Sequence, residues 1–147
     1  MTQEQKDLLF KDLCARLPYN PMVEYKGKTY NVLGVTHERL ILCKPFMSYT
    51  CDELPLVEEV KPYLFPLSSM TVEQLKEIQE IIGNPNEACI SVNTLGLELW
   101  LNPVGTDPSI WIDSVFEIQD WLNAHHFDFR GLIEKSLALD ATNLNIY

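Results

Sequence analysis

The chain has 147 residues, 46% of them hydrophobic and three of them tryptophan, and its formal net charge at pH 7 is −10. This length suits one domain with a sizeable core, and the hydrophobic content excludes a disordered tail. Apolar runs such as Leu40 to Cys43 fall far short of the roughly 20 residues that a membrane span needs. The N-terminal stretch MTQEQKDLLF does not read as a secretory signal, so we expect a cytoplasmic protein.

The first third of the chain predicts a helix followed by strands. Residues 3–17 carry an apolar stripe of Leu9, Phe10, Leu13, Cys14 and Leu17, with a capping box at Thr2 and Gln5. The stretch MVEYKGKTYNVLGV then alternates around a glycine at residue 27, which is typical of a β-hairpin. With RLILC as a third strand, residues 22–43 predict an antiparallel meander.

The middle of the chain is punctuated by prolines. Residues 44–56 predict an aromatic-rich loop, and VEEVKPYLFP predicts an extended segment, which its prolines restrict to a sheet edge or an irregular crossing. Thr71 and Gln74 then predict the capped start of a helix that runs through Ile82 and ends at Gly83. Residues 89–92 and 97–101 predict a second hairpin.

Two further helices are predicted at the end of the chain. Ser114 with Glu117 fits a capping box for the first, and Asp128 fits the cap of the second, whose apolar stripe is Phe129, Leu132, Ile133 and Leu137. The sequence therefore predicts one α+β domain over residues 1–147. It would contain an N-terminal helix, a three-stranded antiparallel meander, a central capped helix, a second β-hairpin and two C-terminal helices.

The charge lies mostly in the later part of the chain. Residues 1–44 hold seven Lys or Arg against five Asp or Glu, whereas residues 45–147 hold four against sixteen. A nucleic-acid-binding protein needs a basic patch, so direct binding of DNA or RNA is disfavoured. The acidic part would suit a basic partner, or it could serve solubility alone.

The four cysteines do not predict disulfides or a metal site. Cys14, Cys43, Cys51 and Cys89 have irregular spacings and follow no signal peptide, so we expect reduced thiols, several of them buried. No nucleophile elbow, HExxH pattern or phosphate-binding glycine loop occurs. We therefore predict no catalytic residues and no cofactor.

The stretch DWLNAHHFDFRGLIEK carries two adjacent histidines, His125 and His126. Adjacent helical residues point about 100° apart, so this spacing does not predict a shared metal ion. A histidine at a helix C-terminus can instead bond the last carbonyl groups, which predicts a corner between two helices, with Asp128 starting the second. Arg130 could pair there with Asp120 or another acid.

Two groups of residues are candidates for binding a protein partner. The first is an aromatic loop with Phe46, Met47 and Tyr49, which could equally pack over the meander. The second is a set of acidic residues: Glu98, Asp107, Asp113, Glu117 and Asp120. Whether the residues between 77 and 129 form one acidic face is left open by the sequence.

Three blocks, DLCARLPY at 12–19, VKPYLFPLSSMTVEQ at 60–74 and WLNAHHFDFRGLIEKSLALDA at 121–141, resemble small uncharacterised proteins of phages and prophages from gut Bacteroidales bacteria. The resemblance implies a phage or mobile-element origin and a cytoplasmic site of action in a bacterial host cell. It implies no catalytic residues.

The sequence favours a non-enzymatic accessory protein that binds a host or phage macromolecule, including an acidic inhibitor that mimics nucleic acid. One alternative is a small-molecule sequestering protein or minor enzyme, with a pocket near the C-terminal helices formed by His125, His126 and Arg130. Another is a component of virion assembly. The oligomeric state is left open.

Overall fold

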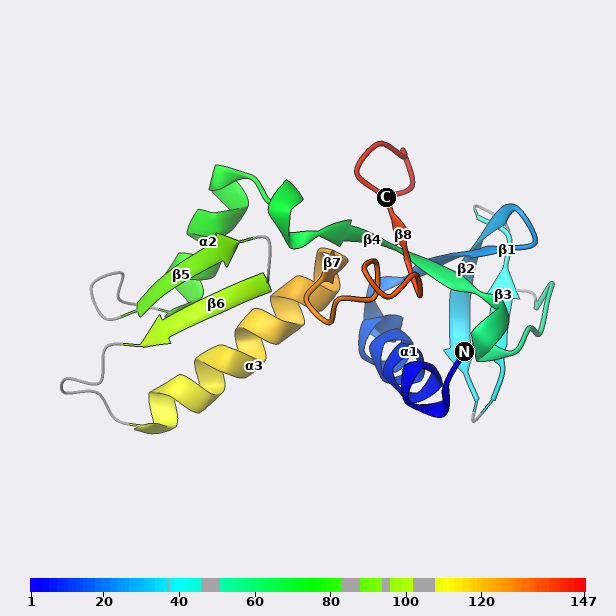
Figure 1. The fold of residues 1–147 in the computed structure, drawn as a ribbon, viewed down its shortest axis with the longest axis horizontal. Helices are drawn as coiled ribbons and strands as arrows, with labels where there is room; N and C mark the ends of the chain where they lie inside the picture. Colours follow the sequence, from blue (N-terminus) through cyan, green and yellow to red (C-terminus); the bar gives the residue numbers. More distant parts are fainter. Residues whose placement is uncertain (37, 46–50, 83–87, 94–95, 102–107) are drawn as a thin grey trace. The chain divides into compact units, whose positions relative to one another are not determined.

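The computed structural model describes residues 1–36, 38–45, 51–82, 88–93, 96–101 and 108–147; within 82–114 it describes the course of the backbone but no side chains. Figure 1 shows helices together with mostly antiparallel strands, which confirms the predicted α+β class. The chain forms two compact units: unit 1 is residues 1–64 with 130–147, and unit 2 is residues 65–129. The assignment of all 147 residues to one domain stays a prediction.

Unit 1 begins with helix α1 (Gln3–Arg16). Its N-terminus carries a reciprocal capping box, in which Gln5 N donates to Thr2 Oγ1 at 3.2 Å and Thr2 N donates to Gln5 Oε1 at 2.9 Å. The buried face consists of Leu9, Asp12, Leu13 and Arg16. Cys14, predicted on the buried stripe, is exposed, because the buried face is rotated toward Asp12 and Arg16.

Strands β1 (Met22–Tyr25), β2 (Lys28–Val35) and β3 (Leu40–Cys43) pair antiparallel in that order. The turn between β1 and β2 is Lys26-Gly27, with φ of 51° and 73°. Two successive positive φ angles are what a tight two-residue hairpin turn needs, and glycine adopts one without strain. Glu24 Oε1 accepts a hydrogen bond from Gly27 N and closes the turn.

The core of unit 1 lies between α1 and this sheet. A short 3-10 turn, η2 (Val57–Glu59), packs against α1. The cluster consists of Leu9, Leu13, Val23, Tyr25, Tyr30, Val32, Leu40, Leu42, Val57 and Val60. A second cluster of Leu64, Leu132, Leu137 and Ala138 brings the C-terminal residues into the same unit.

Strand β4 (Lys61–Pro66) runs from unit 1 into unit 2 and is not an edge strand. On one side it pairs with β1 through two residue pairs, Val23↔Pro62 and Glu24↔Lys61. It also pairs in parallel with β8 (Leu139–Asp140) and β7 (Phe127–Asp128). The edge position predicted from the prolines is therefore wrong; these short pairings fit the predicted alternative, an irregular crossing.

Unit 2 contains helix α2 (Val72–Ile82), the antiparallel hairpin of β5 (Ala88–Asn93) and β6 (Gly96–Leu101), and helix α3 (Pro108–Ala124). At the start of α2, Gln74 N donates to Thr71 Oγ1 at 3.2 Å and Thr71 N donates to Gln74 Oε1 at 2.9 Å. The described core of the unit is Leu67, Ile78, Ile118, Leu122 and Phe127. No helix among the described residues is long and apolar enough to cross a membrane.

Helix α3 begins at Pro108, seven residues before Val115, where a helix capped by Ser114 would start. Ser114 lies inside the helix, so the capping box predicted there with Glu117 is wrong. The helix starts at Pro108, and proline suits the first helical position because its fixed φ is helical and its missing N–H would have no intrahelical acceptor.

The second predicted C-terminal helix is absent from residues 125–147, all of which are described. Asp128 lies in β7 rather than at a helix cap. A single helical turn forms after Gly131 and ends at Ser136. Ser136 adopts a φ of 59°, and Leu137 N donates to the Leu132 carbonyl at 2.9 Å. A residue in the left-handed conformation followed by a hydrogen bond to the carbonyl five residues earlier is the usual pattern that terminates a helix. The buried side chains of Leu132 and Leu137 therefore project from turns and not from a helix.

Candidate functional site

The two units differ sharply in charge. Unit 2 contains ten Asp or Glu and one basic residue, Lys76, which gives a formal charge of −9. Unit 1 contains eleven acids and ten Lys or Arg, which gives −1. The acidic stretch of the sequence thus coincides with one compact unit, while the other is nearly neutral.

Of the acidic residues of unit 2 whose side chains are described, all but Asp128, which is buried in β7, lie on its two helices. Those exposed to solvent are Glu73, Glu77 and Glu80 on α2 and Glu117 and Asp120 on α3. The helices are joined by a hydrogen bond from Trp121 Nε1 to Glu77 Oε2 at 3.2 Å. The acids on α2 and α3 therefore belong to one packed helix pair, which concentrates negative potential on it.

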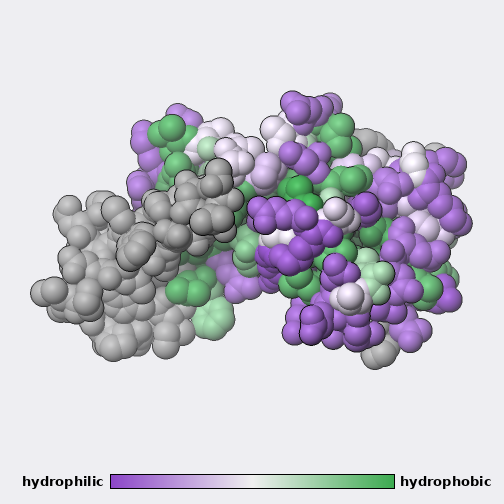
Figure 2. Space-filling view, in the orientation of Figure 1, coloured by the Kyte–Doolittle hydropathy of each residue, from purple (hydrophilic) through white to green (hydrophobic). Residues whose placement is uncertain are grey.

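Helix α3 also exposes apolar side chains. Phe116 is 64% exposed and Val115 is 45% exposed. Figure 2 shows hydrophobic surface over the middle of this helix. An open depression of about 410 Å³ is lined by Phe116, Glu117, Gln119, Asp120 and Asn123. Aromatic side chains are enriched at protein-binding surfaces, so an exposed phenylalanine ring is a candidate contact for a partner.

The histidine pair forms a corner at the end of α3. His125 Nδ1 lies 2.9 Å from the Trp121 carbonyl oxygen, and its ring stacks on the Trp121 indole at a centroid distance of 3.8 Å. His126 is buried and adopts a φ of 58°, and its carbonyl accepts from Phe65 N at 2.9 Å. Among the described residues, no cluster of three His, Cys, Asp or Glu could hold a metal ion.

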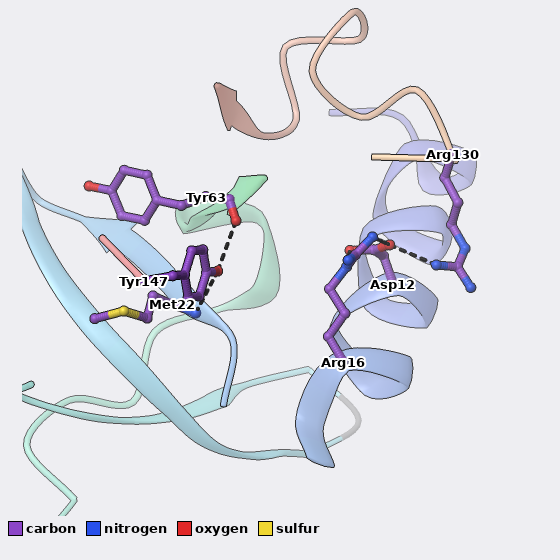
Figure 3. Close-up of polar contacts among 6 residues, drawn as sticks. All are labelled: Asp12, Arg16, Met22, Tyr63, Arg130 and Tyr147. Carbon is purple, nitrogen blue, oxygen red and sulfur yellow. Dashed lines mark hydrogen bonds and ion pairs between the residues drawn. The ribbon is translucent and has the colours of Figure 1, made fainter. Parts of the chain in front are cut away.

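Arg130 lies in unit 1 and pairs with Asp12, which fits the prediction that it pairs with an acid (Figure 3). Asp12 Oδ1 accepts from Arg130 Nη1 at 2.8 Å, and Asp12 Oδ2 accepts from Arg16 Nε at 2.8 Å. Asp12 and Arg16 are both fully buried. The carboxylate thus links α1 to the C-terminal segment, which is a structural role for Arg130.

Tyr147 ties the end of the chain to the point where β1 and β4 separate (Figure 3). Its hydroxyl accepts from Met22 N at 3.2 Å and donates to the Tyr63 carbonyl at 2.9 Å. Met22 and Tyr63 would be the next residue pair of the β1–β4 ladder after Val23↔Pro62. The Tyr147 hydroxyl connects their backbone groups in place of a direct hydrogen bond between the strands. Burial of the phenol raises the pKa of Tyr147 to about 12.

A second depression, in unit 1, has a volume of about 310 Å³ and is lined by Gln3, Lys6, Asp7, Phe10, Glu38 and Val57. Lys6 Nζ lies 2.6 Å from Glu58 Oε2, and this hydrogen bond raises the pKa of Lys6. Neither depression is lined by His125, His126 or Arg130. A pocket formed by these three residues stays a prediction.

Of the predicted partner-binding residues, Glu117 and Asp120 are exposed on α3. Glu98 lies in β6 and Asp113 in α3, and their side chains fall outside the described part of the structure. Phe46, Met47, Tyr49 and Asp107 also lie outside the described residues. Cys14, Cys43 and Cys51 are free thiols, of which Cys43 is buried.

Sequence reasoning overlooked Phe116 and Asp12. Phe116 stands on α3 outside the buried stripe that contains Ile118 and Leu122, and an aromatic residue off the stripe of an amphipathic helix is the signal that could have identified it. Asp12 gave no such signal, because its partner Arg130 is 118 residues away.

Comparison of the chain with protein-family models, with curated proteins and with solved structures gave no match.

Proposed function

We propose that this protein is a non-enzymatic binding protein, a small phage-type accessory factor whose acidic unit 2 engages a basic region of a host or phage protein. The observation that carries the proposal is the distribution of charge, −9 on residues 65–129 against −1 on the rest of the chain. A concentrated charge of one sign steers a partner of opposite charge and raises its association rate.

The proposal also accounts for where the exposed carboxylates lie. Glu73 and Glu80 on α2 and Glu117 on α3 are exposed on two helices that pack together. A partner carrying several Lys or Arg could pair with these acids without displacing any core side chain. The resemblance of three sequence blocks to phage proteins supports a site of action in the cytoplasm of a bacterial host.

The test uses the full chain, an oligo-lysine peptide as the probe, and two variants with equal changes in charge. The first replaces exposed acids of unit 2: Glu73→Gln, Glu80→Gln and Glu117→Gln. The second replaces exposed acids of unit 1: Glu4→Gln, Glu38→Gln and Glu134→Gln. Fluorescence anisotropy of the labelled peptide reports the affinity, and circular dichroism verifies folding.

Loss of three surface charge pairs, each contributing about 0.2 to 1 kcal/mol, should weaken peptide binding at least about threefold in the unit 2 variant. The unit 1 variant should bind as the original protein does. Binding should also disappear at about 1 M salt, where the screening length is about 3 Å. Equal losses in both variants, or binding indifferent to salt, would contradict the proposal.

A further inference from the structure

The depression on α3 combines three features on one helix. Its lining includes an aromatic ring, that of Phe116, and two carboxylates, those of Glu117 and Asp120. Phe116 and Asp120 are four residues apart and Glu117 and Asp120 are three apart, so these side chains are neighbours on the helix surface. Phe116 is 64% exposed, which leaves most of its ring accessible to an incoming group.

This combination distinguishes between the two basic side chains. The guanidinium group of arginine is planar, stacks on aromatic rings and can donate two parallel hydrogen bonds to a carboxylate. The ammonium group of lysine is a compact, strongly hydrated point charge. It can neither stack flat on a ring nor donate two parallel hydrogen bonds to a carboxylate, so it should bind such a site more weakly than arginine. The volume of about 410 Å³ and the open form of the depression let a long side chain enter from solvent.

We propose that the depression on α3 binds an arginine side chain of the basic partner, with the guanidinium stacked on Phe116 and paired with Glu117 or Asp120. This inference rests on the proposed function and adds to it the identity of the residue that is recognised. The rest of the acidic unit then contributes long-range attraction that does not separate arginine from lysine.

The test compares oligo-arginine and oligo-lysine peptides of equal length and charge, bound to the full chain at the same ionic strength. The original protein should bind the arginine peptide more tightly. Phe116→Ala and Phe116→Leu should each weaken binding of the arginine peptide about two- to fivefold, the range expected for an exposed cation–π contact. Phe116→Leu keeps apolar bulk without the ring, so it separates stacking from simple burial.

Val115→Ala is the matched control, because Val115 is the preceding residue, is 45% exposed and does not line the depression. It should leave the affinity for both peptides unchanged. Equal affinity of the original protein for the two peptides, or equal losses for both peptides in Phe116→Ala, would overturn the arginine inference while leaving the proposed function standing. Failure of the protein to bind either peptide would overturn both.

Discussion

Replacing Tyr147 by Phe removes one hydroxyl group that forms hydrogen bonds to both β1 and β4. In the original protein this hydroxyl accepts from Met22 N and donates to the Tyr63 carbonyl. Phenylalanine fills the same space but leaves both backbone groups without this partner. Since a hydrogen bond contributes about 0.5 to 1.5 kcal/mol net, the free energy of unfolding should fall by about 1 to 3 kcal/mol near pH 8.

The pH dependence gives a sharper test. Burial raises the pKa of Tyr147 from 10.0 to about 12, so the folded state holds this proton at pH values where the unfolded state has released it. The stabilisation is complete below pH 10 and is lost as the pH rises toward about 12. The difference between the original protein and Tyr147→Phe should therefore shrink between pH 10 and pH 11. Because the Tyr147 side chain as a whole is 44% exposed, solvent screening keeps this loss below the full value of about 1.36 kcal/mol per pH unit.

Urea unfolding followed by far-UV circular dichroism, at steps between pH 8 and pH 11, measures both effects. Contributions from the other tyrosines cancel when the two proteins are compared at each pH. Asn145→Ala, an exposed position in the same C-terminal segment, is the control and should change stability little. A stability difference that stays constant with pH would refute the reasoning, as would a Tyr147→Phe variant as stable as the original at pH 8.

Three further substitutions test the structure within each unit, and for each the free energy of unfolding is measured in urea. Asp12→Ala removes the carboxylate that pairs with the fully buried Arg16 and should lower the free energy of unfolding by about 3 to 5 kcal/mol. Glu134→Ala, at an exposed position, should lower it little. Equal effects of the two substitutions would count against the buried ion pair of Asp12 and Arg16. Ile78→Ala, at 0% exposure in the core of unit 2, should cost about 2 to 5 kcal/mol, and a loss no larger than that of the exposed Val72→Ala would contradict this packing. Gly27→Ala meets no atom within 4 Å but must hold a φ of 73°, so it should cost about 1 kcal/mol from backbone strain, and a neutral result would argue against this turn.

Features encoded by neighbouring residues could be predicted from the sequence. The capping residues Thr2 and Thr71 form their expected hydrogen bonds, because a cap is satisfied within three residues of its own position. The turn at Lys26-Gly27 is equally local, since it depends on the backbone freedom of one glycine. His125 bonds the Trp121 carbonyl near the end of α3, as expected of a histidine at a helix C-terminus, whereas the second helix of the predicted corner does not form.

Features that depend on distant residues could not be predicted. The apolar spacing at Leu132 and Leu137 matches a helix, but these residues are buried beside Leu64 of β4, and Phe127 joins the core of unit 2. Short parallel pairing with β4 takes the place of helical hydrogen bonds at both ends of this segment. Periodicity within one segment reports which residues are buried and does not report what they pack against.

The central claim, that unit 2 is the binding surface, is tested most directly by backbone amide chemical-shift mapping of the full chain during titration with an oligo-arginine peptide. The account predicts shifts concentrated in residues 65–129, with the largest among described residues at α3 around Phe116 and Asp120. It also predicts that these shifts weaken as salt is added. Shifts centred on α1 or on strands β1 to β3, or no shifts at low salt, would contradict it.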